Sequence, residues 1–331
     1  SLFLIEAIEG LDADNPEHAL DLLSLVESVL EDPTIVIRRQ VDRLKTELIN
    51  RLKAEGVSYD ERMNRLDEVT HPQPIAEYIY AAFERFRIDH PWIGGDAVRP
   101  KSVAREMVED YLGFTDYVRR YGLQRSEGVL LRYLSQVYKT LDQNVPDQVK
   151  TEAVHDIVAF LRAMLERVDT SLIEEWESMR HPELLLEGVP DAKAAHRVLA
   201  AQQLRSDPAA LASRLRAELH QLIASLARRD WEEAATCVRL AADEPSALFE
   251  PEDFSAAMDP FFADHEELIF DHRARLAEHT QLTLVGDNQW HVVQVLLDPS
   301  DGNLWCIEGQ VDLSDEAKVD GPLVVVTRIG T

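Results

Sequence analysis

The feature that most constrains the fold of this chain is a change in the spacing of its apolar residues near residue 279. Before that point, apolar residues recur every three or four positions, as they do along one face of an α-helix. After it, apolar and polar residues alternate with a period of two, which is typical of strands. Four such segments follow one another, with the sequences QLTLV, HVVQVLLD, LWCIEGQVDL and PLVVVTRI. This order predicts a mainly α chain, in which a multi-helix bundle precedes a small α+β domain.

The stretch Ser206-Asp207-Pro208 looks like a domain boundary. We therefore expect a helical bundle over 1–182, an Ala-rich helical linker over 183–206 and an α+β domain over 207–331. The helices expected in the last domain are Leu211–Leu226, Trp231–Ala242 and Pro251–Ala277.

The order of elements in the last domain is similar in outline to the cone-shaped SnoaL-like fold. Such a cone can enclose a pocket, so one alternative is that this part of the chain binds a small molecule. The other alternative is that the aromatic residues that could line such a pocket pack in an ordinary core. The residues that would line a pocket are Trp231, His265, Asp271, Trp290 and Trp305. His265, His272 and His279 are each seven positions apart, roughly 10 Å along a helix, which is too far for one metal ion. We expect neither a metal nor a bound cofactor in this chain.

The charge of the chain limits where a nucleic acid could bind. With 34 basic and 61 acidic side chains, the formal net charge is −27, and phosphates would be repelled over most of such a surface. Two windows reverse the sign, because Arg38–Arg65 and Arg99–Lys139 each contain 8 basic and 5 acidic residues. We expect any contact with a polyanion in these two windows. An acidic module that binds protein partners and touches no RNA is the alternative.

The segment from Ser126 to Gln143 predicts an amphipathic helix with two contrasting faces. Apolar residues fall within a narrow arc on one side, at Leu130, Leu134, Val137 and Leu141. The opposite side carries two cations, two amides and no carboxylate, at Arg132, Gln136, Lys139 and Gln143. A sugar–phosphate chain lying across that side would meet hydrogen-bond donors at every turn. An ordinary solvated helix face is the competing interpretation.

A second basic group precedes this helix and contains Arg99, Lys101, Arg105 and Arg125, with Arg119 and Arg120 between them. These side chains could guide a nucleic-acid strand toward the helix or dock the bundle on an acidic protein surface. Ion pairs on helix surfaces are the alternative. The group formed by Arg38, Arg39, Arg43 and Lys45 allows the same interpretations.

The longest unusual stretches of the chain resemble the C-terminal region of bacterial DEAD/DEAH-box helicases, a segment classed as a domain of unknown function. They include RPKSVAREM, YGLQRSEGVLLRYL, ALDLLSLVESVLEDP and DTSLIEEWE, and the resemblance covers roughly residues 1–180. At greater distance, SEGVLLRYL is similar to a segment of exosome-associated RNA helicases. In those proteins the segment opens a ratchet helix that contacts threaded single-stranded RNA.

The resemblance implies an RNA-binding face on the predicted helix. It places Glu127, Gly128 and Arg132 on the matching Glu, Gly and Arg of the helicase segment. The next two RNA-contacting positions fall on Gln136 and Lys139, where those helicases usually have a basic and an acidic residue. The implied partners are single-stranded RNA, bound weakly by this region alone, and the helicase motor domains of the same polypeptide.

The motor itself is not encoded in these residues. No G-x-x-x-x-G-K-[ST] loop occurs, so ATP and Mg²⁺ would bind elsewhere in a longer protein and we expect no enzyme activity from this region. Apolar residues Leu2, Ile5 and Ile8 indicate a helix entered midway, which leads us to expect the motor upstream of Ser1. The remaining features predict a cytoplasmic protein without a membrane span: no apolar run reaches the roughly 20 residues needed, and Cys237 and Cys306 match no redox spacing.

Overall fold

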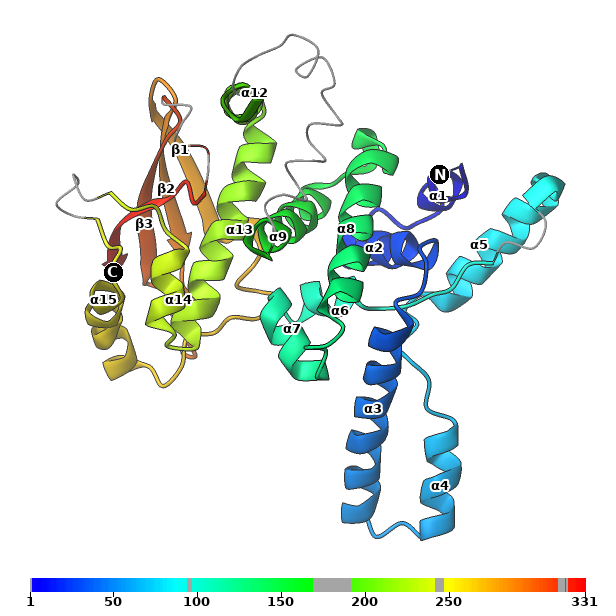
Figure 1. The fold of residues 1–331 in the computed structure, drawn as a ribbon. Coiled ribbons are helices and arrows are strands. Elements are labelled where there is room, and N and C mark those ends of the chain that lie inside the picture. Colours follow the sequence, from blue (N-terminus) through cyan, green and yellow to red (C-terminus); the bar gives the residue numbers. More distant parts are fainter. Residues whose placement is uncertain (1, 94–96, 169–191, 242–246, 315–318, 320) are drawn as a thin grey trace. The chain divides into compact units, whose positions relative to one another are not determined.

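The computed structural model describes residues 2–93, 97–168, 192–241, 247–314, 319 and 321–331 (Figure 1). The chain divides into two compact units, residues 1–169 and 170–331. The first is helical and the second combines helices with one antiparallel sheet. The predicted fold class, a helical bundle followed by a small α+β domain, is therefore confirmed.

The N-terminal unit is built from amphipathic helices around a core of fully buried apolar residues, among them Leu22, Leu25 and Leu134. Helix α8 packs against α2, α3 and α9, so it lies near the middle of this bundle. The helices are α1 (Leu2–Ile8), α2 (His18–Ser28), α3 (Thr34–Ala54), α4 (Tyr59–Asp67), α5 (Ala76–Asp89), α6 (Ala104–Glu109), α7 (Phe114–Tyr121), α8 (Glu127–Asn144) and α9 (Glu152–Val168).

Helices α3 and α4 form a hairpin that extends away from the rest of the N-terminal unit (Figure 1). Its base is anchored by Val36, which is fully buried, and by Gln40, whose Nε2 donates to the carbonyl oxygen of Ser102 at 2.6 Å. Toward its far end the only fully buried side chain of α3 is Leu52, and α4 has none. The hairpin is therefore fixed at one end and largely solvated along its length.

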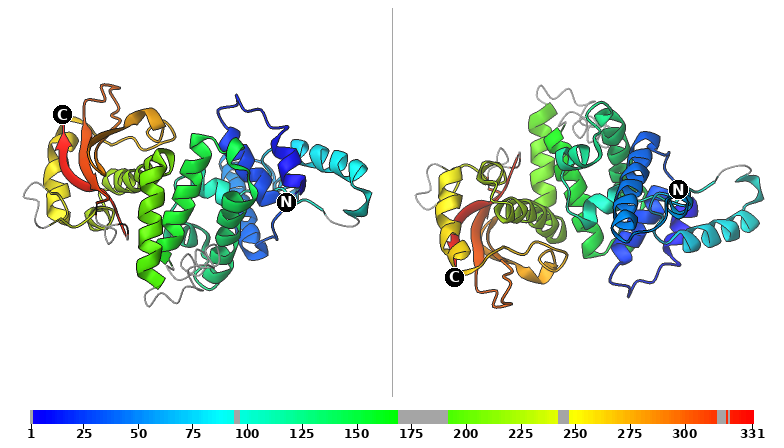
Figure 2. Two further views of the ribbon diagram at one scale, coloured as in Figure 1. Left: turned by 90° about the horizontal axis from the view of Figure 1, so that it is seen from above. Right: turned by 90° about the horizontal axis from the view of Figure 1, so that it is seen from below.

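The C-terminal unit places helices beside a four-stranded meander, seen in orange to red in Figure 2. Helix α13 begins where the sequence predicted, because Asp207 accepts hydrogen bonds from the amides of Ala209 and Ala210 and Pro208 occupies the first turn. Its elements are α12 (Ala192–Ser206), α13 (Pro208–Ala227), α14 (Trp231–Thr236), α15 (Pro251–Asp264), β1 (Thr280–Gly286), β2 (Gln289–Val295), β3 (Cys306–Asp312) and β4 (Val325–Gly330).

The four predicted strands are confirmed, and each pairs antiparallel with the next in the order β1-β2-β3-β4. Helix α15 packs against β4, and Phe254 and Phe261 of α15 are fully buried together with Val292 and Ile307 of the sheet. Apolar residues on the sheet and on the helices thus share a single core cluster.

Three predictions about this part of the chain were wrong. The helix expected over Trp231–Ala242 ends at Thr236. Residues 192–206 are not a linker, because Ala201 and Leu204 of α12 belong to the same buried cluster as α13 and the sheet; the earlier part of the predicted linker lies outside the described residues. The helix expected over Pro251–Ala277 ends at Asp264. Beyond Asp264 the backbone is extended at His265. Ile269 then forms an isolated antiparallel β-bridge with Leu297, so its backbone hydrogen bond is made to a distant segment and not within a helix.

Candidate nucleic-acid interface

Helix α8 has the two faces that its sequence predicts. Leu130, Leu134, Val137 and Leu141 are buried against the bundle, at exposures of 0 or 1%. On the opposite side Arg132 is exposed, and no hydrogen bond or ion pair joins its side chain to any other described residue. One face of α8 therefore belongs to the core, and the other presents a cation to solvent.

The two further residues predicted to contact RNA lie on the same side of α8 as Arg132. Gln136 is half-buried, and its carbonyl oxygen accepts from the Thr140 hydroxyl at 2.9 Å within the helix. Lys139 is also half-buried and interacts with other groups of the protein. The face is accessible at Arg132 and partly accessible at Gln136 and Lys139, over a rise of roughly 10 Å along the helix axis.

A buried carboxylate fixes the position of α8. Tyr133, on the core side of the helix, donates its hydroxyl to Glu27 Oε1 at 2.7 Å. The same carboxylate accepts the backbone amides of Val103, Ala104 and Arg105 at 2.8, 2.8 and 3.0 Å, at the start of α6. Glu27 is fully buried, and this burial raises the pKa of its carboxyl despite the four donors. The contact joins α2, α6 and α8, so the polar face of α8 stands on a well-fixed helix.

Sequence reasoning missed Glu27, although the signal was present. It lies in the run LLSLVESVL, where a single acid interrupts an otherwise apolar helix face. A carboxylate at such a position needs buried donors to compensate for its lost hydration. The free amides at the start of α6 supply them.

Lys101 was predicted to bind RNA, and the structure contradicts this. Its side chain is 0% exposed. The ammonium group donates to the carbonyl oxygens of Glu27 and Leu30 at 2.8 and 2.7 Å and lies 3.0 Å from Asp32 Oδ1. Burial lowers the pKa of Lys101, while Asp32 opposes that shift. Lys101 therefore joins the end of α2 to the segment before α6 and cannot reach a ligand at the surface.

Arg105 was also predicted to bind RNA, and it too is buried, at 6% exposure. Its guanidinium bonds to three carboxylates, on Glu17 at 2.8 Å, Asp21 at 2.9 Å and Glu109 at 2.7 Å. These acids, together with the Ser24 hydroxyl at 3.1 Å, occupy all three of its nitrogens. Arg105 holds α6 against α2, and its buried guanidinium is already engaged by three carboxylates.

The other predicted residues remain at the surface. The Arg99 side chain is 65% exposed and pairs with Asp32 at 3.2 Å. Arg125 is exposed just before α8, without an ion-pair partner among the described residues. Of the neighbouring cations, Arg120 pairs with Asp110, and Arg119 pairs with Asp116 at 3.3 Å. The structure thus leaves Arg125 and Arg132 as the cations of this group that are both exposed and unpaired within the described chain.

The comparison with protein families covers both units. A family model described as Domain of unknown function (DUF3516) matches residues 1–329. The chain belongs to this family. The match covers both the helical bundle and the α+β domain. No curated protein and no solved structure matches the chain.

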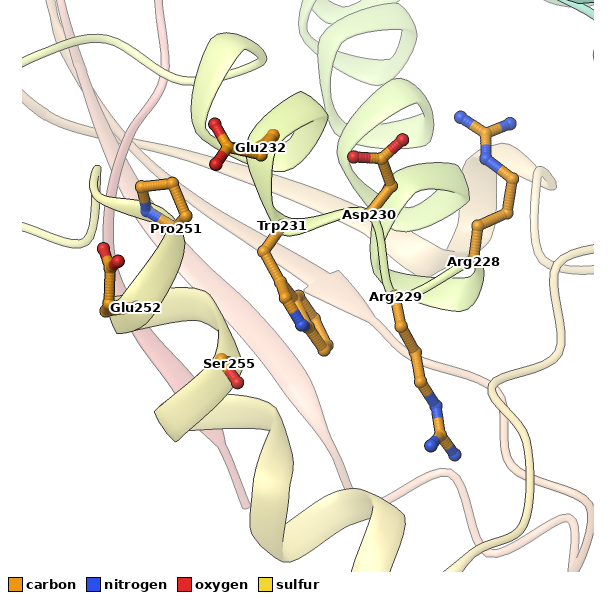
Figure 3. Close-up of a pocket in the computed structure, with 8 residues that line it drawn as sticks. All are labelled: Arg228, Arg229, Asp230, Trp231, Glu232, Pro251, Glu252 and Ser255. Atoms are coloured by element: carbon orange, nitrogen blue, oxygen red, sulfur yellow. The ribbon is translucent and has the colours of Figure 1, made fainter.

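A cavity of about 590 Å³ lies on the C-terminal unit of this family member, between the start of α14 and α15 (Figure 3). Trp231 projects from α14 toward Ser255 of α15, and acidic and basic side chains surround them. The lining residues are Arg228, Arg229, Asp230, Trp231, Glu232, Pro251, Glu252 and Ser255. Asp230 already caps α14 by accepting the amide of Glu233, so its carboxylate is engaged within the fold.

Of the five residues predicted to line a pocket in a cone, only Trp231 lines this cavity. His265 and Trp305 instead pack on the ring of Phe261, at centroid distances of 4.8 and 5.4 Å. Asp271 pairs with Arg273 at 2.9 Å. Of the two alternatives, packing in an ordinary core holds for His265 and Trp305, because both contact Phe261, which is fully buried.

The residues that the structure describes contain neither a candidate metal centre nor a candidate membrane-spanning helix. Within those residues no group of three or more His, Cys, Asp or Glu side chains could hold a metal ion. A search of the same residues finds no helix with the length and apolarity that a bilayer crossing requires.

Proposed function

We propose that this chain is the accessory region of an ATP-dependent RNA helicase and that it guides single-stranded RNA along the outward face of α8. ATP hydrolysis would take place in motor domains of the same polypeptide, on which the bundle would dock. The observation that carries the proposal is the exposed, unpaired guanidinium of Arg132 on a helix fixed from its other side by Glu27 and Tyr133.

The geometry supports this proposal in two ways. A rigid helix loses little conformational entropy on binding, so a weakly attractive face can still select a strand. Arginine also offers several donors in a fixed plane that suits phosphate oxygens. The resemblance of SEGVLLRYL to the ratchet-helix segment of RNA helicases points to the same face.

The proposal is tested with the 331-residue chain and a fluorescein-labelled U20 RNA, by anisotropy at low salt. Arg132→Glu with Gln136→Glu adds two carboxylates to the face and lowers the net charge by three. Arg87→Glu with Gln281→Glu makes the same charge change at exposed positions on α5 and β1. We expect about tenfold weaker binding for the α8 variant, corresponding to about 1.4 kcal/mol, and binding within about twofold of wild type for the control.

Equal affinities for the two variants would remove α8 from the RNA path. If the wild-type chain bound no RNA at low salt, the proposal would fail, and the alternative of an acidic module for protein partners would gain support. The large acidic surplus of the chain is what favours that alternative.

A further inference from the structure

Helix α3 concentrates positive charge in a protein that is acidic as a whole. It is 21 residues long, with the sequence TIVIRRQVDRLKTELINRLKA, and it carries six basic and two acidic side chains. Its net charge is +4, so the remaining residues total −31 against −27 for the whole chain. Solubility does not explain this charge, because a protein with such an acidic surplus is already kept apart by repulsion.

The cations of α3 are exposed and mostly not neutralised by neighbouring acids. Arg43 pairs with Glu47 at 2.7 Å. Four others are exposed and have no ion-pair or hydrogen-bond partner in the part of the chain that the structure describes, namely Arg38, Arg39, Arg51 and Lys53. This contrasts with Lys101 and Arg105, whose charges are met by carboxylates inside the bundle.

The polar side chains of α3 are arranged along its axis. Arg39, Thr46, Asn50 and Lys53 are spaced by seven, four and three residues, which places them within about 60° on one face. From Arg39 to Lys53 the helix rises roughly 21 Å. The side toward α4 is different, because Leu52 is buried there. A chain of phosphates could follow this face over most of the length of the hairpin.

The far end of the hairpin adds an aromatic side chain. Tyr59, the first residue of α4, is 65% exposed. The Arg62 guanidinium lies 5.9 Å from the centre of its ring. An exposed ring beside cations is the combination that binds single strands, with a base stacked on the ring and the phosphates on the cations. The combination favours single-stranded nucleic acid over an acidic protein.

We propose that the α3–α4 hairpin is a second RNA-binding surface, on which the phosphates of a single strand follow the outward face of α3 and a base stacks on Tyr59. The surface is distinct from the α8 face, since its residues belong to the α3–α4 hairpin, which extends away from the rest of the N-terminal unit (Figure 1). The surface is preformed, because Val36 and Gln40 already anchor α3.

The experiment compares two triple variants of the 331-residue chain in titrations with labelled U20 RNA at several NaCl concentrations. Arg38→Ala, Arg39→Ala and Lys53→Ala remove three unpaired cations from α3. Alanine preserves the helix, because its helix propensity is the highest of all residues. The control removes three exposed arginines outside the hairpin that already pair with acids, by Arg87→Ala, Arg228→Ala and Arg273→Ala.

We expect the α3 variant to bind at least about tenfold more weakly at low salt and to lower the slope of log K against log[salt] by about 2, since each lost phosphate contact on single strands removes about 0.7. The control should keep the wild-type slope. Tyr59→Ala should weaken binding by at least about fivefold without changing the slope, because stacking involves no counterion release.

Equal slopes for the α3 variant and the control would overturn the proposal. So would binding of poly-L-glutamate that depends on the α3 cations while the U20 titration is unchanged, because the partner would then be an acidic polypeptide. The α8 variant described above separates the two surfaces. If only that variant loses affinity, the α8 proposal stands and the hairpin proposal fails; if only the α3 variant loses affinity, the reverse holds.

Discussion

Replacing Lys101 by methionine tests whether this residue belongs to the fold or to an RNA-binding surface. The ammonium group is fully buried and lies within 3.0 Å of three oxygens, on Glu27, Leu30 and Asp32. Methionine retains much of the volume but leaves two carbonyl oxygens without this donor and the Asp32 carboxylate without its buried cation. Breaking a buried ion pair from one side costs about 3–5 kcal/mol. Because the Asp32 side chain is 25% exposed, water can partly solvate it, and we expect a loss near the lower end, about 3 kcal/mol.

The matched control is Arg99→Ala, which removes the second cation of the same carboxylate. The Arg99 side chain is 65% exposed and lies 3.2 Å from Asp32 Oδ2. An exposed pair of this kind contributes at most about 1 kcal/mol. Urea unfolding followed by circular dichroism at 222 nm measures both variants. With a slope of about 2 kcal/mol per molar urea, Lys101→Met should lower the midpoint by about 1.5 M and Arg99→Ala by less than about 0.5 M.

The RNA titration completes this test. If Lys101 only supports the fold, then Lys101→Met should bind U20 RNA with wild-type affinity under conditions where it remains folded. A variant with an unchanged urea midpoint and clearly weaker RNA binding would refute the reasoning. That result would mean that the ammonium group reaches the surface, as the sequence alone predicts.

Three further predictions concern the C-terminal unit. Burial, with the cation of Arg275 nearby, lowers the pKa of His220 to about 3, whereas the unfolded residue titrates near 6.5. Stability that is present at pH 7 is therefore lost as the pH falls below 6.5, and urea unfolding should show a loss of about 2 kcal/mol at pH 5. His220→Gln should remove this pH dependence. Gly309→Ala should cost about 1–3 kcal/mol in thermal unfolding, since its Cβ would lie 2.8 Å from Val324 Cγ1. Asp207→Ala should cost about 1 kcal/mol in the same measurement, because it removes the cap of α13.

The sequence predicted those structural features that are determined by residues close together in the chain. The period of two located all four strands, and the spacing of Leu130, Leu134, Val137 and Leu141 identified the buried side of α8. The stretch Ser206-Asp207-Pro208, interpreted from the sequence as a boundary, lies where α13 begins. Each of these signals arises within a few residues of the feature it specifies, so one sequence is sufficient to detect it.

The errors share a different cause, because they depend on contacts between distant residues. Lys101 and Arg105 have the composition of a surface, yet their partners on α2 lie more than 70 positions away in the chain. An acid such as Glu27 can turn a nearby basic motif into part of the core, and spacing cannot reveal this. The linker prediction failed similarly, because the apolar side of α12 is weak by itself and is buried only against α13.

The difference between buried, paired cations and exposed cations also bears on how a basic hairpin would attract phosphate in an acidic protein. Inside the bundle, cations such as Lys101 and Arg105 are cancelled by carboxylates within about 3 Å and contribute little field outside. A basic face lying flat on an acidic surface would lose much of its attraction for phosphate, because the Debye length at physiological salt is about 8 Å. Helix α3 is roughly 31 Å long, so Arg51 and Lys53 lie more than one Debye length beyond Gln40 at the base of the hairpin. The length of the helix therefore separates these two cations from the acidic surface of the N-terminal unit.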